Sequence, residues 1–223
     1  MTFNVVTSQF WPLLISGIAL GFIYVLISLG YTMVYGVLRL INFANSEIFM
    51  MGTFATVITS RQFYKFDVNT NPLSGSRLII VLGTFLLCSM LTSGITAVIV
   101  ELIAYRRLRA KGTNRLASLI SAIGTSIMLQ EGVRILTHST PLANPRVMNK
   151  FDVVTFGSTG IRNDILLVIV FAALLFYGID RLVSKTLLGK AIRAVSMSEE
   201  TARLMGINLN RVISATFFIG GVT

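Results

Sequence analysis

The first 38 residues of this 223-residue chain contain no charged side chain, and the first charged residue is Arg39. A helix needs roughly 20 apolar residues to cross a bilayer, so this run is long enough to span it. The run is too long for the apolar core of a signal peptide, and no basic segment precedes it. We therefore expect a membrane helix that is retained. Apolar residues make up 54% of the chain and charged residues 13%, which a water-soluble domain could hardly carry without large exposed apolar patches.

Charged residues divide the sequence into six apolar runs, most of which can form membrane helices. The runs are 12–38, 48–60, 78–100, 116–130, 165–179 and 212–223. Run 48–60 corresponds to about 20 Å of helix, which is shorter than the hydrocarbon layer of about 30 Å. Extending it back to Ile41 supplies the length and brings polar residues into or near the membrane. Run 212–223 is also too short to cross, so we expect the sequence to be incomplete at its C-terminus.

Small residues recur at the four-residue spacing that lets helices approach closely in lipid. The sets are Gly17 with Gly21, Ser89 with Ser93 and Ala97, and Ser118 with Ala122 and Ser126. They predict an all-α fold, a polytopic membrane helix bundle, and indicate nothing about a substrate.

The distribution of lysine and arginine predicts which loops face the cytoplasm. Segment 105–115 holds five basic residues and no acidic one, and segment 181–211 holds six basic residues. Basic residues concentrate in short cytoplasmic loops, so both segments are expected inside, and the two spans between them agree with this. Loops 61–77 and 138–164 carry three basic residues each and are expected outside. The N-terminus also lies outside if the first two runs form a simple hairpin, whereas a broken or re-entrant entry into the second run would change its side.

Other functional classes lack support in the sequence. A net charge of +10 would suggest nucleic acid binding in a soluble chain, but here the basic residues lie between apolar runs, so no nucleic acid partner is expected. The single cysteine, Cys88, excludes an intrachain disulfide, and the single histidine, His138, lies in an outward loop without companion metal ligands. No zinc-protease or serine-hydrolase motif is present. Residues 187–191 resemble the end of a phosphate-binding loop but lack the rest of it, so this chain is not expected to bind ATP.

The second basic segment is the part of the sequence that is most informative about function. Ser196 and Glu199 have the spacing of a capping box at a helix N-terminus, and Glu200 adds a favourable charge there. Gly206 suits the position that ends such a helix. We therefore predict a short helix over 197–205 that docks on a cytoplasmic partner. The alternative is an amphipathic helix that rests on the lipid headgroups.

The same segment carries a resemblance to a known family. Its sequence GKAIRAVSMSEETARLMGI, residues 189–207, resembles the cytoplasmic signature of the branched-chain amino acid ABC-transporter permease family, the LivH type. The matching positions are Gly189, Lys190, Ala191, Arg193, Ala194, Ala202, Gly206 and Ile207. Residues 21–52, which include an Asn-Phe-Ala motif, resemble the N-terminal part of the family, and residues 101–109 and 116–130 resemble its next turn and helix. The similarity covers the chain from Gly17 onward.

The resemblance implies a transmembrane permease subunit of an ABC importer for branched-chain or related amino acids. Residues 1–223 would form a single membrane permease domain, which in the family continues through further helices, and residues 185–210 would be its cytoplasmic coupling segment. The candidate contacts with separate ATPase subunits are Gly189, Lys190, Ala191, Arg193, Ala194, Glu199, Glu200, Ala202 and Gly206.

The resemblance also implies the partners and the location of the chain. The other implied partners are a second permease subunit, an extracytoplasmic substrate-binding protein and the lipid bilayer. ATP would be used by the partner subunits, so this chain would need no cofactor and would not be an enzyme. The implied location is the bacterial plasma (inner) membrane.

Asn42, Asn45 and Glu47 are the candidate residues of the substrate path. Extending run 48–60 back to Ile41 brings them into or near the membrane, and the resemblance includes the same segment. Polar groups inside a membrane are costly unless they pair or line a wet cavity. The alternative for Glu47 is that it lies at the interface and caps a helix. The family commonly has His-Gly where Asn45 and Ser46 stand here, so a role of that histidine is not carried over.

The sequence leaves other functions open. A permease of the same type could transport urea or short amides. A passive membrane channel would need no docking helix, so loss of transport on mutating Arg193 and Ala194, with membrane insertion preserved, would separate an importer from a channel. A membrane-embedded enzyme should keep a reactive cluster, and none is visible in the sequence.

Overall fold

The computed structural model describes the chain except for a few short stretches. The described residues are 2–66, 73, 75–111, 115–140, 142, 147–156 and 159–223. In chain order the elements are α1 (Thr2–Leu38), α2 (Asn45–Ile58), the π-helix η1 (Thr59–Phe63), α3 (Ser76–Val100), the π-helix η2 (Glu101–Arg106), α4 (Arg107–Ala110), α5 (Arg115–Leu136), β1 (Asp152–Phe156), β2 (Thr159–Arg162), α6 (Asn163–Lys185), α7 (Leu187–Met197), α8 (Glu199–Leu204) and α9 (Leu209–Val222).

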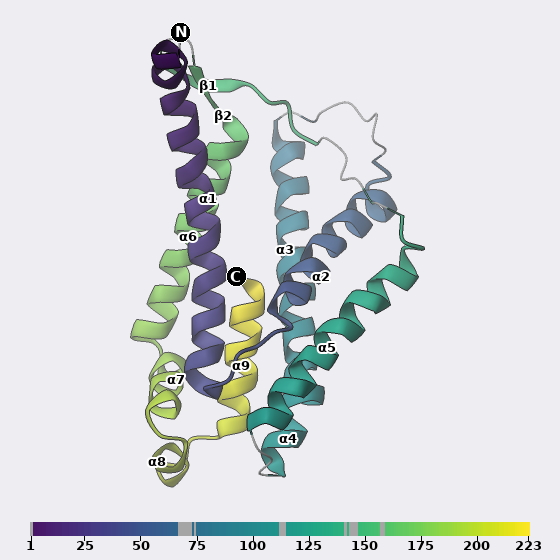
Figure 1. Ribbon diagram of the computed structural model, residues 1–223, viewed down its shortest axis with the longest axis vertical. Helices are drawn as coiled ribbons and strands as arrows, with labels where there is room; N and C mark the ends of the chain where they lie inside the picture. The colour runs from purple at the N-terminus through teal and green to yellow at the C-terminus, as the bar shows by residue number, and fades with distance from the viewer. Residues whose placement is uncertain are drawn as a thin grey trace.

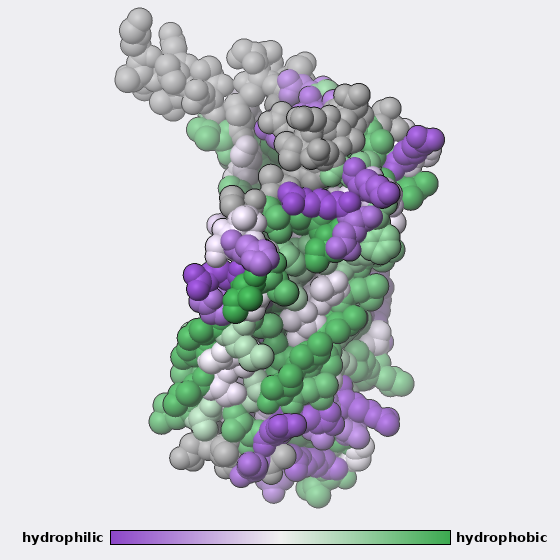
Figure 2. Space-filling model, turned by 90° about the vertical axis from the view of Figure 1, so that its right-hand side faces the viewer, coloured by the Kyte–Doolittle hydropathy of each residue, from purple (hydrophilic) through white to green (hydrophobic). Residues whose placement is uncertain are grey.

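Four helices among the described residues are long and apolar enough to cross a membrane. They are Leu13–Leu38, Ser76–Arg109, Leu116–Leu136 and Asn163–Lys185, and α9 is apolar but shorter. Large apolar side chains are exposed along these helices, and Figure 2 shows them as a band across the middle of one face with hydrophilic side chains above and below it. Exposed apolar surface of this extent requires lipid or protein partners. The predicted polytopic membrane helix bundle is therefore confirmed.

The helices define two ends of the bundle. α1, α3 and α6 run in one direction, and α2, α5 and α9 run in the opposite direction (Figure 1). The described parts of the two basic segments lie at the same end, where α4, α7 and α8 are found, whereas the N-terminal end of α1 and the strands lie at the other. This shared end agrees with the prediction that both basic segments lie on one side of the membrane. By the positive-inside rule we expect that side to be the cytoplasm, so we call it the cytoplasmic end, and α1 begins at the opposite end.

A non-helical segment, residues 39–44, joins α1 to α2 and turns back into the bundle. Arg39 adopts a φ of 53°, a left-handed backbone that is uncommon outside glycine. The chain then rises between the helices, and α2 begins at Asn45 about halfway along the bundle (Figure 1). The helix of run 48–60 extends back to Asn45, but the extension expected to reach Ile41 is not helical over residues 41–44, so the first two runs do not form a simple helical hairpin.

Small residues bring α2, α3 and α9 close together. A Cβ at Gly52 of α2 would lie 3.0 Å from Oγ of Ser89 and 3.2 Å from Cβ of Ser93, both on α3. The Ser93 hydroxyl lies within hydrogen-bond distance of the carbonyls of Ile48, at 3.2 Å, and of Gly221. The close packing predicted along this face of α3 is therefore confirmed.

The packing predicted for Gly17 and Gly21 is not found. Both glycines are exposed, and a Cβ at either position would meet no atom of the described chain within 4 Å. Spacing alone does not identify the helix face that packs within one chain, because lipid or another chain can cover the same face.

A short hairpin of β1 and β2 lies at the outer end. The strands are antiparallel, with Asp152 opposite Arg162 and Phe156 opposite Thr159. These strands were not predicted from the sequence, although Val153, Val154 and Thr155 are β-branched and favour them. The hairpin leaves the all-α class of the membrane bundle unchanged.

Candidate functional site

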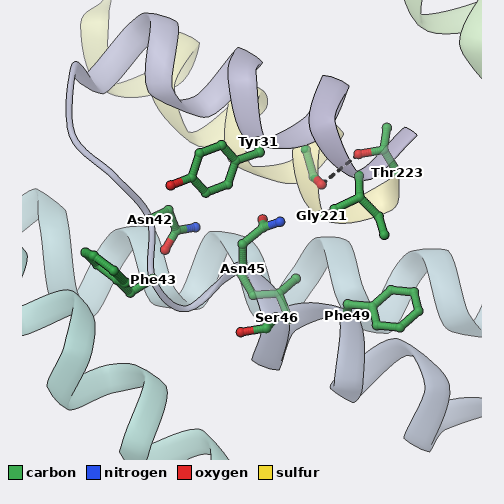
Figure 3. Close-up of a pocket in the computed structure, with 11 residues that line it drawn as sticks. Tyr31, Asn42, Phe43, Asn45, Ser46, Phe49, Gly221 and Thr223 are labelled. Carbon is green, nitrogen blue, oxygen red and sulfur yellow. Dashed lines mark hydrogen bonds between the residues drawn. The ribbon is translucent and has the colours of Figure 1, made fainter. Parts of the chain in front are cut away.

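A cavity of about 400 Å³ lies where segment 39–44 meets three helices. Its lining comes from α1, segment 39–44, α2 and the end of α9, and consists of Ile27, Tyr31, Asn42, Phe43, Asn45, Ser46, Ile48, Phe49, Gly220, Gly221 and Thr223. The lining is mainly apolar with a few polar groups, as is typical of sites for small molecules, and the volume lies in the range of such sites. Figure 3 shows the side chains of Tyr31, Asn42 and Asn45 facing this space.

Asn42 supplies an unpartnered donor to the cavity. The residue is only 3% exposed. Its Oδ1 accepts hydrogen bonds from the Tyr105 hydroxyl and from the Ala44 backbone N–H, both at 3.1 Å. Its Nδ2 is buried and has no hydrogen-bond partner among the described residues. A buried donor without a partner costs roughly 1–3 kcal/mol, so this amide is suited to bind a polar group inside the cavity.

The other two predicted path residues differ in their position. Asn45 is half-buried and lines the cavity at the start of α2. Glu47 is half-buried in the first turn of α2, accepts a hydrogen bond from the Ser46 hydroxyl at 2.8 Å and is not among the lining residues. The structure therefore brings Asn42 and Asn45 together at one cavity, with Glu47 beside it. The role of all three in transport stays a prediction.

A second cavity of about 160 Å³ adjoins the first. It shares Phe49, Gly221 and Thr223 with the first cavity and extends to residues of α3 and α6. The two cavities together run along the inner faces of α2 and α9. Phe49 lies between them and is the largest of the shared side chains.

The coupling segment forms two helices, where the sequence analysis predicted one. α7 begins after Thr186, whose hydroxyl accepts a hydrogen bond from the Gly189 N–H at 3.1 Å. Gly189 packs so closely on the carbonyl of Val183 in α6 that a Cβ there would clash with it. This contact fixes the sharp turn between α6 and α7 and explains why glycine occupies the position.

The predicted capping residue of the second helix is wrong by two positions. α8 is capped by Ser198, whose hydroxyl accepts from the Thr201 N–H at 3.2 Å. Ser196 lies in the last turn of α7 and donates to the Arg193 carbonyl. Capping-box spacing could not distinguish the two serines, because it did not reveal that a preceding helix already includes the first.

The predicted end of the second helix is confirmed. Gly206 has a φ of 78°, and its N–H donates to the Arg203 carbonyl at 3.0 Å. The N–H of Ile207 donates to the Ala202 carbonyl at 3.0 Å, which completes a Schellman motif.

The alanines of the coupling segment face the bundle and not the cytoplasm. Ala202 is buried in the hydrophobic core, and Ala191 and Ala194 are half-buried against it. The predicted contacts Lys190, Arg193 and Glu200 are exposed, and Glu199 is half-exposed.

Exposed apolar side chains on the coupling segment were missed by the sequence analysis. They are Leu187, Met197, Leu204 and Met205, each about four-fifths exposed at 79–83%. They belong to α7 and α8 or directly follow α8, and Figure 1 shows these two helices at the cytoplasmic end of the bundle. The signal in the sequence was the presence of large apolar residues within a strongly basic segment.

A buried ion pair between η2 and α4, which continue the α3 helix, is hydrogen-bonded to α9. Glu101 is fully buried and pairs with Arg109 at 3.1 Å. Its second carboxylate oxygen accepts from the Ser214 hydroxyl at 2.8 Å, and Arg109 also donates to Oδ1 of Asn210 at 2.9 Å. The network therefore fastens α9, which follows the coupling segment, to the end of α3.

The chain is similar to a defined family over almost its whole length. Residues 13–223 match the model of a family described as "Branched-chain amino acid transport system / permease component". The "High-affinity branched-chain amino acid transport system permease protein BraD" of Pseudomonas aeruginosa is 35% identical over 212 residues, 93% of this chain and 66% of that protein. The LivH proteins of Escherichia coli strain K12 and Salmonella typhimurium, which carry the same description, are 34% and 33% identical over 210 residues.

The match covers part of each relative. It takes in 92% of this chain and 65% of each LivH protein, so the chain spans slightly less than two thirds of the length of these curated relatives. No solved structure matches the chain significantly. Helices long enough to cross a membrane and bacterial permease relatives together indicate a multi-pass inner-membrane protein.

Proposed function

Because the chain belongs to the branched-chain amino acid transport permease family, we propose that it is a transmembrane permease subunit of an ABC importer for branched-chain or related amino acids. In this proposal it forms part of the substrate path and couples to separate ATPase subunits, which hydrolyse the ATP. A second permease subunit completes the path, and an extracytoplasmic binding protein delivers the substrate.

The observation that carries the proposal is the cavity with the unpartnered Asn42 amide. An apolar wall with few polar groups suits a substrate that has an aliphatic side chain and a polar head. Asn42 Nδ2 can donate to a carboxylate of such a substrate, and Asn45 adds a second amide at the same wall. Glu47 stands beside this wall and is included in the proposed path.

The coupling segment supplies the proposed contact with the ATPase. Its outward surface combines exposed apolar side chains, Leu204 and Met205, with the charges of Lys190, Arg193 and Glu200. Exposed apolar side chains together with exposed charges are suited to a protein partner. Closure of the ATPase subunits would rock α7 and α8 and alternate the access of the cavity.

The decisive experiment is reconstitution of the complete transporter in liposomes. ATP-dependent uptake of labelled leucine is measured with the binding protein present, and urea and acetamide serve as competitors. We expect leucine uptake that requires both ATP and the binding protein. Uptake of urea without leucine uptake would favour the amide permease, and uptake independent of ATP would favour a passive channel.

A second measurement addresses the coupling surface. Because Ala194 packs inward, a bulky residue there would disturb α7 itself, so Leu204→Glu is the cleaner substitution. We expect Leu204→Glu to reduce co-purification of the ATPase while the membrane bundle stays folded. Phe63→Glu, an equally drastic change of an exposed residue at the outer end, should leave co-purification unchanged.

A further inference from the structure

Arg39 bonds directly to the end of a coupling helix. Its Nη2 donates to the carbonyl oxygens of Ser196, at 3.1 Å, and Met197, at 2.9 Å. These are the last residues of α7, and the final carbonyls of a helix have no partner within the helix. A positive charge at this end also interacts favourably with the helix dipole. Arg39 therefore caps α7, although 157 positions separate it from Ser196.

Arg39 also begins the segment that carries Asn42. Only two residues lie between the two positions, so three steps along the chain span at most about 10 Å. The Tyr105 hydroxyl donates a hydrogen bond to Oδ1 of Asn42, and the unpartnered Nδ2 of Asn42 faces the cavity (Figure 3). A shift of the end of α7 can thus reach the cavity wall through one short stretch of backbone.

The backbone of Arg39 is not the reason for an arginine at this position. A φ of 53° places a Cβ near the following carbonyl, which costs free energy for any residue except glycine. Glycine would suit the turn better. What arginine adds is the pair of hydrogen bonds to α7, which glycine cannot make.

We propose that Arg39 is the positioning residue through which α7 and α8 act on the cavity. The guanidinium ties the end of α7 to segment 39–44, so that movement of the coupling helices moves Asn42 relative to Tyr31 and Asn45. This inference rests on the proposed function for its role in transport, but the mechanical link itself can be tested on the chain alone.

The test compares Arg39→Gly, which relieves the backbone and removes the link, with Lys65→Gly. Lys65 is an exposed basic residue with a φ of 51° that follows η1 at the outer end, so the control also replaces a basic residue by glycine in the same backbone conformation. In the reconstituted transporter, leucine uptake per ATP hydrolysed should fall about tenfold in Arg39→Gly, as expected for loss of a charged hydrogen bond. Arg39→Lys keeps the charge but loses the forked guanidinium donors. Its leucine uptake per ATP hydrolysed should therefore lie between those of the wild type and of Arg39→Gly.

Hydrogen exchange supplies a readout that needs no transport. The Ala44 N–H donates to Oδ1 of Asn42, so its exchange reports whether segment 39–44 is held in place. In the isolated chain, Arg39→Gly should accelerate this exchange and Lys65→Gly should not. Unchanged exchange at Ala44 together with an unchanged uptake ratio would overturn the inference. Absence of ATP-driven uptake in the wild type, with accelerated exchange in Arg39→Gly, would instead overturn the proposed function and leave the link standing.

Discussion

The hydroxyl of Tyr105, at the cytoplasmic end of the α3–η2 helix, donates a hydrogen bond to Oδ1 of Asn42 at 3.1 Å. Both residues are buried, and the Tyr105 ring packs on Phe217 of α9 with ring centroids 5.5 Å apart. Asn42, and with it this wall of the cavity, is therefore held by Tyr105, which packs against α9. It is also held by the backbone N–H of Ala44 in its own segment. The orientation of the Asn42 amide depends on this contact.

Tyr105→Phe tests the contact by removing one hydroxyl. We expect a loss of about 1 kcal/mol of stability, as for a typical buried hydrogen bond, and a clear loss of uptake because the amide can rotate. Thermal unfolding of the purified protein and uptake in liposomes measure the two effects. Tyr64→Phe is the matched control, since the Tyr64 hydroxyl bonds Thr84 at 2.9 Å near the outer end of the bundle. It should lower stability similarly and leave uptake unchanged.

The buried pair of Glu101 and Arg109 should be costly to break from one side. Arg109→Gln leaves the fully buried carboxylate without its charge partner, for which we expect a loss of about 3–5 kcal/mol. The double variant Glu101→Gln/Arg109→Gln should lose less unfolding free energy than the sum of the losses in the two single variants. A double-mutant cycle of unfolding measures this difference. Glu131→Gln, in an exposed pair with Arg134, should cost about 0–1 kcal/mol. Additive losses at Glu101 and Arg109 would argue against the pair as a unit.

Gly189→Ala should open the turn between α6 and α7. The added methyl group meets the backbone carbonyl of Val183, which cannot move aside without shifting the start of α7. We expect the chain to insert in the membrane but to co-purify poorly with the ATPase subunit. Gly178→Ala, at a position of α6 where a Cβ meets nothing within 4 Å, is the control and should behave as the wild type.

Single cysteines test the orientation of the bundle once Cys88 is replaced by serine. Cysteines at Lys111 and Glu200, both exposed, should resist an impermeant thiol reagent added to intact cells. Cysteines at Ser139 and Lys150 should react with it, because they are exposed at the opposite end. Position 112, in the same basic segment 105–115, lies outside the described residues. Rapid labelling at Lys111 together with protection at Lys150 would reverse the topology.

Features that depend on local chemistry could be predicted from the sequence. The absence of charge predicted the long spans, and the basic residues predicted which segments share an end. The short run before Arg61 predicted that polar residues of the preceding segment lie in or near the membrane. Predictions of this kind rest only on the length that a helix needs to cross the membrane and on the cost of placing charge in lipid.

Contacts between distant segments could not be predicted in the same way. Glu101 and Arg109 are eight residues apart, beyond the three- or four-residue spacing that marks a helical pair, and the π-helix between them changes their relative direction. The bonds from Arg39 to α7 cross 157 positions and involve backbone carbonyls, which leave no mark on the sequence. Such contacts are fixed by tertiary packing alone.

Replacement of Asn42, in segment 39–44, and of Glu47, in the first turn of α2, will distinguish the contributions of these two polar residues to transport. Asn42→Ala removes the donor that faces the cavity, so we expect uptake to fall about tenfold or more, the equivalent of one buried hydrogen bond to a charged group. Glu47→Gln keeps the shape and removes the charge, and its bond from Ser46 can persist, so we expect a smaller loss. Initial rates of leucine uptake at equal amounts of assembled transporter measure both. A larger loss of uptake in Glu47→Gln than in Asn42→Ala would indicate that Glu47, and not Asn42, is the main polar residue of the substrate path. Wild-type uptake rates in Glu47→Gln would indicate that the Glu47 carboxylate has only a structural role, at the first turn of α2.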